Sequence, residues 1–299
     1  MHPRGEARAA SAAGAAGTAY TLSTLSGTAI EEVGHASRGP LWYQLYLVGG
    51  RAVAEAALAR AAASRFSALL VTVDTPVAGL RERDLRNGTP QLVARRPLGM
   101  LPFVGQFLMR PAWLAGFLAD GGLMRFPNVV LASGPMPYVE VGPALAASVV
   151  SWKDLAWVRD AWPGSLVVKG VLTDEDARRA VDEGADGIVV SNHGGRQLDG
   201  APATLRVLPE IVRAVGDRTE VLLDGGIRRG ADVAKALCLG ARAVLVGRAY
   251  AYGLAAGGEP GVARAIEILR SELVRTLKLL GCAAVSELDG SFVNAPKSW

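Results

Sequence analysis

Residues 187–200 read Gly-Ile-Val-Val-Ser-Asn-His-Gly-Gly-Arg-Gln-Leu-Asp-Gly, and this stretch indicates the fold. Its first four residues carry no charge and predict a short strand that is buried on both faces. A turn with an imidazole, two glycines and a guanidinium follows. Such a turn places His193 and Arg196 at the carboxyl edge of a sheet, where barrels and open α/β sheets bind ligands. His193 could move a proton near neutral pH, and Arg196 could bind a carboxylate or phosphate with two hydrogen bonds.

Apolar strands and helices alternate on both sides of this stretch. Seven segments, this stretch included, are predicted to be strands. They lie at residues 19–23, 41–47, 68–73, 166–169, 187–191, 220–224 and 243–246. Helices are predicted at residues 6–16, 28–36, 50–65, 151–161, 173–183, 202–215, 230–239 and about 261–280. For the helix 28–36, Thr28 is the expected cap, because Glu31 follows at the spacing of a capping box.

The order of these elements predicts an α/β fold. Strands that alternate with helices pair in parallel through helical crossovers. Seven strands with polar carboxyl ends favour a (β/α)8 barrel of the TIM type over an open sheet. A barrel that lacks one strand has two unpaired edges and loses the stagger that closure needs. Since the sequence opens on a helix, we expect the missing first strand in front of residue 1.

A long insertion follows the strand 68–73, which would be the fourth strand of the complete barrel. Residues 77–150 show no clean alternation and contain recurring prolines and glycines. They predict an irregular insertion or lid. Because regular elements resume after it, we expect one domain over residues 1–299.

Residues 98–118, LGMLPFVGQFLMRPAWLAGFL, are strongly apolar. Two prolines and Arg110 interrupt them, so they are a poor membrane-spanning helix. With Arg95, Arg96 and Arg110, the stretch could lie on an anionic membrane surface. The alternative is a lid that is buried over the mouth of the barrel.

Composition argues against several classes of protein and site. The formal net charge of the 299 residues is only +4, which implies no nucleic-acid surface. Cys238 and Cys282 predict small buried hydrophobic side chains in a reducing compartment. The sequence has no Cys-x-x-Cys or Cys/His cluster, so no metal site is predicted. Its first residues contain no apolar signal segment, and we expect a cytoplasmic protein.

Every predicted strand ends in, or is followed by, a polar residue, and together these residues predict a polar ring at one mouth of the barrel. They are Ser23, Gln44, Tyr46, Thr72, Asp74, Lys169, Ser191, His193, Asp224 and Arg248. Asp-Gly-Gly-Ile-Arg at 224–228 and Gly247-Arg248 follow the last two strands, where barrels usually bind phosphate. No Gly-x-Gly-x-x-Gly follows a strand, which disfavours a Rossmann dinucleotide site.

These motifs resemble those of the FMN-dependent α-hydroxy acid oxidising enzymes, which include lactate and glycolate oxidases and lactate and mandelate dehydrogenases. The matching segments are residues 44–46, 72–76, 151–154, 169–171, 191–199 and 223–230. The resemblance covers essentially the whole chain and is weakest between about residues 87 and 150. Asp-Gly-Gly-Ile-Arg alone also occurs in other FMN barrels, whereas the combination is specific.

The resemblance implies roles for the residues that would meet the substrate. His193 would take a proton from the substrate, and Asp74 would stabilise the imidazolium that results. Arg196 and Arg81 would bind the substrate carboxylate. Tyr46 would contact the hydroxyl or the carboxylate. Removal of the substrate hydrogen as hydride and through a carbanion are both compatible with these roles.

The resemblance also implies FMN as cofactor. Lys169 would lie near flavin N1 and O2, where positive charge favours the reduced state. The flavin ring or ribityl chain would be bound by Ser23, Gln44, Thr72 and Ser191. The ribityl and phosphate end would be bound by Asp224, Gly225, Gly226, Arg228, Gly247 and Arg248.

Three of these residues have a simpler interpretation. Lys169 could extend out of the barrel to solvent. Asp224 could only cap the helix that follows it. Arg81 lies in an irregular loop, where exposed arginines are common.

The sequence therefore predicts an enzyme that oxidises an L-2-hydroxy acid, lactate or a close relative, to the 2-oxo acid. The electron acceptor would be oxygen or a quinone. A quinone would suit a chain that binds the inner face of the cell membrane through residues 98–118, and the family resemblance implies a homo-oligomer, such as a tetramer.

Two alternatives stay open. One is another FMN barrel, such as an isopentenyl diphosphate isomerase-like protein, in which a carboxylate-binding pair of arginines would have no purpose. The other is a non-catalytic remnant without the family's N-terminal segment, which carries the first strand and a tyrosine that helps to bind the substrate. Such a chain should bind FMN poorly.

Overall fold

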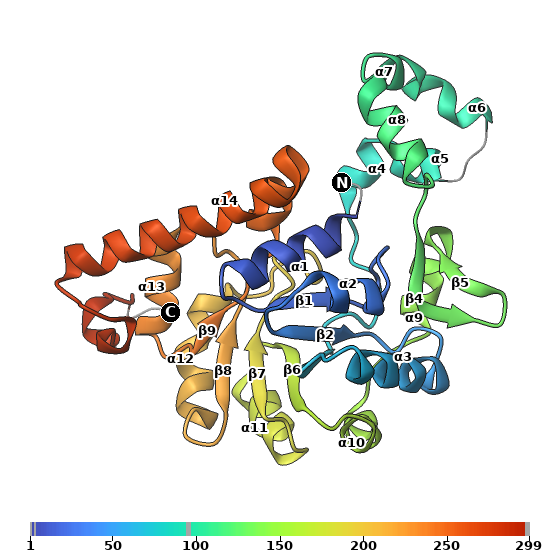
Figure 1. Cartoon of the computed structure of the whole chain (residues 1–299). Coiled ribbons are helices and arrows are strands. Elements are labelled where there is room, and N and C mark those ends of the chain that lie inside the picture. The colour runs from blue at the N-terminus through green and yellow to red at the C-terminus, as the bar shows by residue number, and fades with distance from the viewer. Residues whose placement is uncertain (1, 3, 94–96, 297–299) are drawn as a thin grey trace.

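The computed structural model describes residue 2 and residues 4–93 and 97–296, and a curled, wholly parallel sheet lies at its centre (Figure 1). Within these residues the sheet has seven strands, and their order follows the chain. They are β1 (Tyr20–Ser23), β2 (Leu41–Leu45), β3 (Ala68–Thr72), β6 (Ser165–Val171), β7 (Gly187–Val190), β8 (Glu220–Leu223) and β9 (Ala243–Val244). Sequential parallel order is the arrangement of a TIM-type barrel, and this prediction is confirmed.

Helices surround the sheet (Figure 1); the first precedes β1, the last follows β9, and the others lie between strands. They are α1 (Gly5–Ala15), α2 (Ile30–Ala36), α3 (Arg51–Ala63), α10 (Trp152–Ala161), α11 (Asp174–Asp182), α12 (Thr204–Val215), α13 (Gly230–Cys238) and α14 (Arg248–Leu280). The strands β3 and β7 are buried along their whole length. Burial on both faces is expected where a parallel sheet is packed against helices.

No backbone pairing joins β1 to β9 among the described residues, so these two strands are the edges of the curl. The last strand is short, and α14 begins only four residues after it. Tyr250 in the first turn of α14 packs edge-to-face against Tyr20 of β1, with ring centroids 6.3 Å apart. This contact packs the start of α14, which follows the edge strand β9, against the other edge strand, β1.

The terminal helix is longer than the sequence predicts. It was expected from about residue 261, but α14 begins at Arg248 and is broken by non-helical backbone at Gly257 and Gly258. This break explains the difference, because the helical pattern restarts only after it. The helix packs along α1 and α13.

The insertion after β3 is more regular than predicted. It contains the short helices α4 (Glu82–Arg86), α5 (Thr89–Val93), α6 (Pro97–Met100), α7 (Val104–Leu108), α8 (Pro111–Ala119) and α9 (Val141–Ala146). An antiparallel hairpin of β4 (Arg125–Leu131) and β5 (Gly134–Pro137) lies between α8 and α9. The remaining helical turns are of the 3-10 type, at Leu101–Phe103, Tyr138–Glu140, Val285–Glu287 and Gly290–Phe292.

The hairpin has a small core of its own and also supports α2. Phe126, Val129 and Met136 are buried together with Val48 from the loop after β2. The predicted cap Thr28 does not bond the first turn of α2. Instead the backbone N–H of Ile30 donates to the side-chain oxygen of Asn128, at 3.0 Å, and Asn128 donates to the carbonyl of Thr28. The cap is thus supplied from β4, while the Thr28 hydroxyl donates to Glu6.

The apolar stretch 98–118 does not form a buried lid, which was one of the two arrangements predicted for it. It forms α6 to α8, which stand away from the sheet (Figure 1), and none of the side chains described there is buried. Leu108 is 71% exposed and Met109 is 76% exposed. Arg95 and Arg96, which were predicted to accompany this stretch, lie outside the described residues. No helix in the described ranges is both long and apolar enough to cross a membrane.

Candidate active site

Four residues of the predicted polar ring form one layer of side chains inside the curl of the sheet. Below it lies a small apolar cluster from four strands, separate from the main core, made of Leu70, Val167, Val189 and Leu222. Because side chains alternate between the faces of a strand, the residue two positions later lies on the same face. Those residues are Thr72, Lys169, Ser191 and Asp224. The four strands therefore place a polar layer directly above an apolar one.

Hydrogen bonds connect the polar ends of the first three strands. The Ser23 hydroxyl donates to the side-chain oxygen of Gln44, at 2.8 Å, and the Gln44 amide nitrogen donates to the Thr72 hydroxyl, at 2.9 Å. Gln44 and Thr72 are buried. The orientation of the Gln44 amide is therefore fixed on both sides.

Lys169 points into the ring and not out of the barrel. Its ammonium group donates to the Ser191 hydroxyl at 2.9 Å and pairs with a carboxylate oxygen of Asp224 at 2.9 Å. The side chains of Lys169 and Asp224 are only 12% and 17% exposed. The simpler interpretation of Asp224 as a helix cap also fails, since Asp232 accepts the N–H groups of Arg228 and Arg229 at the start of α13.

His193 and Asp74 form a hydrogen-bonded pair across two loops. The ring nitrogen Nδ1 of His193 lies 3.0 Å from Asp74 Oδ1. His193 has a left-handed backbone with φ of 55°, and its N–H donates to the Ser191 hydroxyl. The second carboxylate oxygen of Asp74 is buried without a hydrogen-bond partner among the described residues. This pairing leaves Nε2 of the imidazole directed away from Asp74.

Three arginines gather beside this pair. Arg196 lies in the turn after β7, Arg81 in the loop after β3, and Arg248 at the start of α14. Partial burial, followed by the positive charge of Arg81 and more weakly that of Arg248, lowers the pKa of the Arg196 guanidinium, while Asp84 opposes the shift. Arg248 donates to the carbonyl of Gly194 at 2.7 Å. The turn that carries His193 is thus surrounded by positive charge.

Tyr46 lies close to the same groups. Burial, together with the negative charge of Asp74, raises the pKa of the Tyr46 phenol well above its ordinary value, although Arg81 opposes the shift. A raised pKa keeps the phenol protonated throughout the neutral range. Tyr46 is therefore a neutral hydrogen-bond donor.

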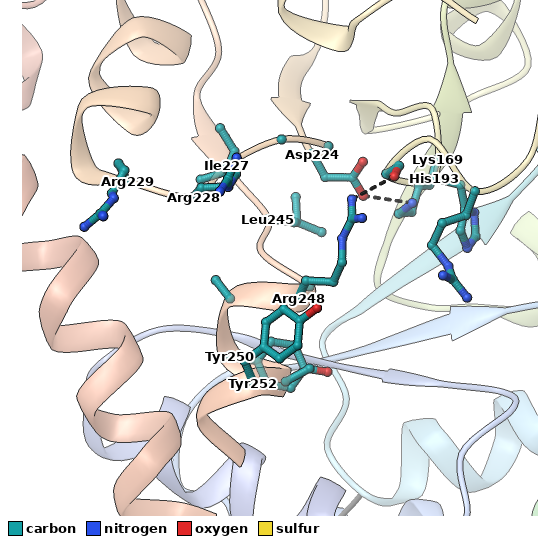
Figure 2. Close-up of a pocket in the computed structure, with 17 residues that line it drawn as sticks. Lys169, His193, Asp224, Ile227, Arg228, Arg229, Leu245, Arg248, Tyr250 and Tyr252 are labelled. Atoms are coloured by element: carbon teal, nitrogen blue, oxygen red, sulfur yellow. Dashed lines mark hydrogen bonds and ion pairs between the residues drawn. The ribbon is translucent and has the colours of Figure 1, made fainter. Parts of the chain in front are cut away.

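A cavity of about 900 Å³ opens at this edge of the sheet (Figure 2). Predicted site residues that line it are Lys169, His193, Arg196, Asp224, Gly225, Gly226, Arg228, Gly247 and Arg248. Figure 2 shows Arg248 extending from α14 toward Asp224 and Lys169. Arg229, on the far side of the cavity, bonds Glu272 of α14 instead. The predicted residues outside this lining are Ser23, Gln44, Tyr46, Thr72, Asp74, Arg81 and Ser191.

A family model described as FMN-dependent dehydrogenase matches residues 1–295. The chain belongs to the FMN-dependent dehydrogenase family. The predicted family and its cofactor FMN are confirmed by this match.

Relatives of known name support the same assignment. An L-lactate dehydrogenase of Caulobacter vibrioides is 46% identical over 292 residues, which are 96% of this chain and 74% of that protein. An L-lactate oxidase of a Nostoc species is 44% identical over 300 residues, 98% of this chain and 76% of that protein. The solved structure of (S)-mandelate dehydrogenase, a monotopic membrane protein, matches with a TM-score of 0.89 at 37% identity. The match covers 98% of this chain and 77% of the mandelate dehydrogenase chain.

The cavity of this FMN-dependent dehydrogenase suits its cofactor. Its volume lies within the range of ligand pockets. Asp224 Oδ1 is buried and has no partner within the described residues, so it is free to accept a hydrogen bond from a hydroxyl group. At Gly226 and Gly247 nothing lies within 4 Å of where a side chain would begin. Arg228 supplies positive charge at the end of the cavity away from Lys169 and His193, as a phosphate would need, while Arg248 extends toward Asp224 and Lys169 (Figure 2).

Sequence reasoning missed two polar residues that shape this site. Thr204 donates to the carbonyl of Asp224, at 2.7 Å, and so fixes the turn after β8. Gln197 bonds the loop that carries Asp74. Gln197 stands in the stretch that indicated the fold, but an amide in a polar loop gives no sign of its partners.

Proposed function

We propose that this chain oxidises an L-2-hydroxy acid of the lactate or mandelate type to the 2-oxo acid. The observation that carries the proposal is the His193–Asp74 pair, which adjoins Arg196 at one cavity edge. The named relatives act on lactate and mandelate. A proton acceptor beside an arginine that can bind a carboxylate is what oxidation of a 2-hydroxy acid needs.

His193 would act as the base. With Nδ1 hydrogen-bonded to Asp74, the free Nε2 is the nitrogen that can accept a proton from the substrate. Asp74 has a second role once that proton has moved, because a carboxylate 3.0 Å from the ring stabilises an imidazolium. This is the orienting role that a carboxylate has in other histidine-based sites.

Arg196 and Arg81 would bind the substrate carboxylate. A guanidinium and a carboxylate can form two parallel hydrogen bonds, which fix orientation as well as position. The two positive charges repel each other, and a bound carboxylate would neutralise this repulsion. Tyr46, protonated in the neutral range, would donate a hydrogen bond to the hydroxyl or the carboxylate.

FMN supplies the oxidant, since it accepts two electrons when bound. Lys169 would place fixed positive charge near flavin N1 and O2. The ring or ribityl chain would be bound by Ser23, Gln44, Thr72 and Ser191. The ribityl and phosphate end would be bound by Asp224, Gly225, Gly226, Arg228, Gly247 and Arg248.

The proposal is tested by loading the chain with FMN and adding 2-hydroxy acids without oxygen. We expect L-lactate or (S)-mandelate to bleach the visible absorbance of the flavin, and D-lactate to leave it unchanged. The reason for the selectivity is that the arginines would face the carboxylate, while His193 and the bound flavin would each face a different one of the remaining substituents of the α carbon. Uptake of FMN without bleaching by any L-2-hydroxy acid would instead support the non-catalytic alternative, as would failure to take up FMN.

We further propose that residues 98–118 bind the surface of an anionic membrane. The exposed side chains there include Leu98, Leu108, Met109 and Trp113. Phe107, Trp113 and Phe117 stack on one another, with ring centroids 6.0 and 5.2 Å apart. Exposed apolar and aromatic side chains beside an arginine are typical of segments that insert into the headgroup layer. One similar structure is of a monotopic membrane protein.

This attachment would bring the chain to the inner face of the cell membrane and favour a quinone over oxygen as electron acceptor. We also propose that the chain forms a homo-tetramer, because the family resemblance implies it. Light scattering of the purified protein measures the number of subunits.

Flotation with liposomes that contain phosphatidylglycerol measures the membrane contact. We expect the wild-type chain to float with the vesicles. The variant Leu108→Glu/Met109→Glu should bind about 100-fold more weakly, because two exposed apolar side chains that would insert into the membrane surface are lost. Leu279→Glu is the matched control, since Leu279 on α14 is also exposed. Equal flotation of the double variant and the wild type would contradict the proposal.

A further inference from the structure

The side-chain amide of Gln197 joins the two loops that carry the proposed substrate-binding residues. Its nitrogen donates to the backbone carbonyls of Asp74 and Val77, each at 3.0 Å. Its oxygen accepts the backbone N–H of Gly79, at 3.2 Å. Both ends of one amide are therefore used by a single segment, residues 74–79, which lies 118 to 123 positions away in the sequence.

The backbones of the two loops also touch. A side chain at Gly79 would begin 2.2 Å from the carbonyl oxygen of Arg196 and 2.9 Å from the amide oxygen of Gln197. Real contacts of this kind are never so short, so only glycine allows the two chains to approach this closely. The loop after β3 is therefore seated directly on the turn after β7.

This contact holds like charges together. Residues 74–79 lead to Arg81, and the turn after β7 carries Arg196. The positive charge of Arg81 lowers the pKa of the Arg196 guanidinium. Without a bound carboxylate the two arginines repel each other, and this repulsion acts to separate the loops. Gln197 opposes the separation without adding charge, because an amide is neutral.

We propose that Gln197 is a positioning residue that keeps the loop after β3 on the turn after β7 before substrate binds. The amide thereby fixes Asp74 relative to His193 and Arg81 relative to Arg196. The inference rests on the proposed function for the identity of the substrate but not for the contact between the loops. Loss of the amide should then weaken substrate binding more than it slows the oxidation of bound substrate.

The experiment compares Gln197→Leu and Gly79→Ala with the wild type, each loaded with FMN. Hydrogen exchange of residues 75–81 should become about tenfold faster in both variants. Gln197→Leu removes three hydrogen bonds, and Gly79→Ala prevents the close approach of the two loops. KM for L-lactate should rise about tenfold while kcat changes by less than about threefold. The double variant should show no more than the larger single effect, since both changes break one contact.

Two variants serve as controls. Gln91→Leu makes the same substitution at an exposed glutamine on α5, and Gly142→Ala adds a methyl group where nothing lies within 4 Å. Both should leave hydrogen exchange and KM unchanged.

Unchanged exchange of residues 75–81 in Gln197→Leu and Gly79→Ala would overturn the inference. Faster exchange with an unchanged KM would also overturn it, because the amide would then only stabilise the loop. If the wild type takes up FMN but oxidises no 2-hydroxy acid, the proposed function fails, and the exchange measurement still decides whether Gln197 holds the loops together.

Discussion

Replacing His193 with glutamine is expected to slow the reduction of bound FMN by L-lactate by about 10²–10⁴-fold, the usual contribution of a general base. Glutamine can still reach Asp74 with a hydrogen bond, but it cannot accept the proton of the substrate. The uptake of FMN should be retained, because His193 bonds only Asp74 and Ser191 among the described residues. Anaerobic stopped-flow absorbance of the flavin measures the rate.

His35→Gln is the matched control for this variant. His35 is on α2, where its ring bonds the carbonyl of Glu31, and it lies outside the cavity lining. Its replacement should change the rate by less than about twofold, as surface substitutions do. A His193→Gln protein that binds FMN and reduces it at near the wild-type rate would show that another group takes the proton.

The barrel could be predicted because each strand carries its own evidence. The apolar run before His193 predicted β7, which is buried throughout. The alternation of side chains then explains why Thr72, Lys169, Ser191 and Asp224 form one layer, since each follows an interior apolar residue by two positions. Local pattern and parallel order together were sufficient for this part of the fold.

Partners that are distant in the sequence could not be predicted in the same way. The cap of α2 comes from Asn128, which is 98 residues away from Ile30, while the local candidate Thr28 is engaged by Glu6. The hairpin that supplies Asn128 contains Pro127, Pro135 and Pro137, and prolines obscure a strand pattern although an isolated hairpin tolerates them.

In the candidate site, too, the residue types could be predicted but their distant partners could not. The residue types at the ends of the strands indicated a polar cavity, and the family resemblance assigned their roles. The pairing of His193 with Asp74 spans 119 positions, and no local pattern contains it. Gln197 shows the limit most clearly, because two of its three partners, Val77 and Gly79, lie in a segment that the sequence predicted to be irregular.

Replacing Arg196 with methionine is expected to lower kcat/KM for L-lactate by about 10²–10³-fold, because a charge-assisted pair with the substrate carboxylate is worth roughly 2–5 kcal/mol. Methionine fills similar space without charge. Arg81→Met should act in the same direction with a smaller effect, because Arg196 lines the cavity and Arg81 does not. Steady-state turnover with a dye as electron acceptor measures both variants.

L-lactamide distinguishes binding of the carboxylate from a general disturbance of the site. This analogue has no carboxylate charge, so the wild type should prefer lactate strongly and Arg196→Met should not. The ratio of the two kcat/KM values cancels any loss of FMN or of folded protein, since both substrates meet the same enzyme. Arg264→Met, at an exposed arginine on α14, should keep the wild-type ratio. If Arg196→Met keeps it as well, the carboxylate is bound elsewhere, and the pairing of Arg196 with Arg81 must have another purpose.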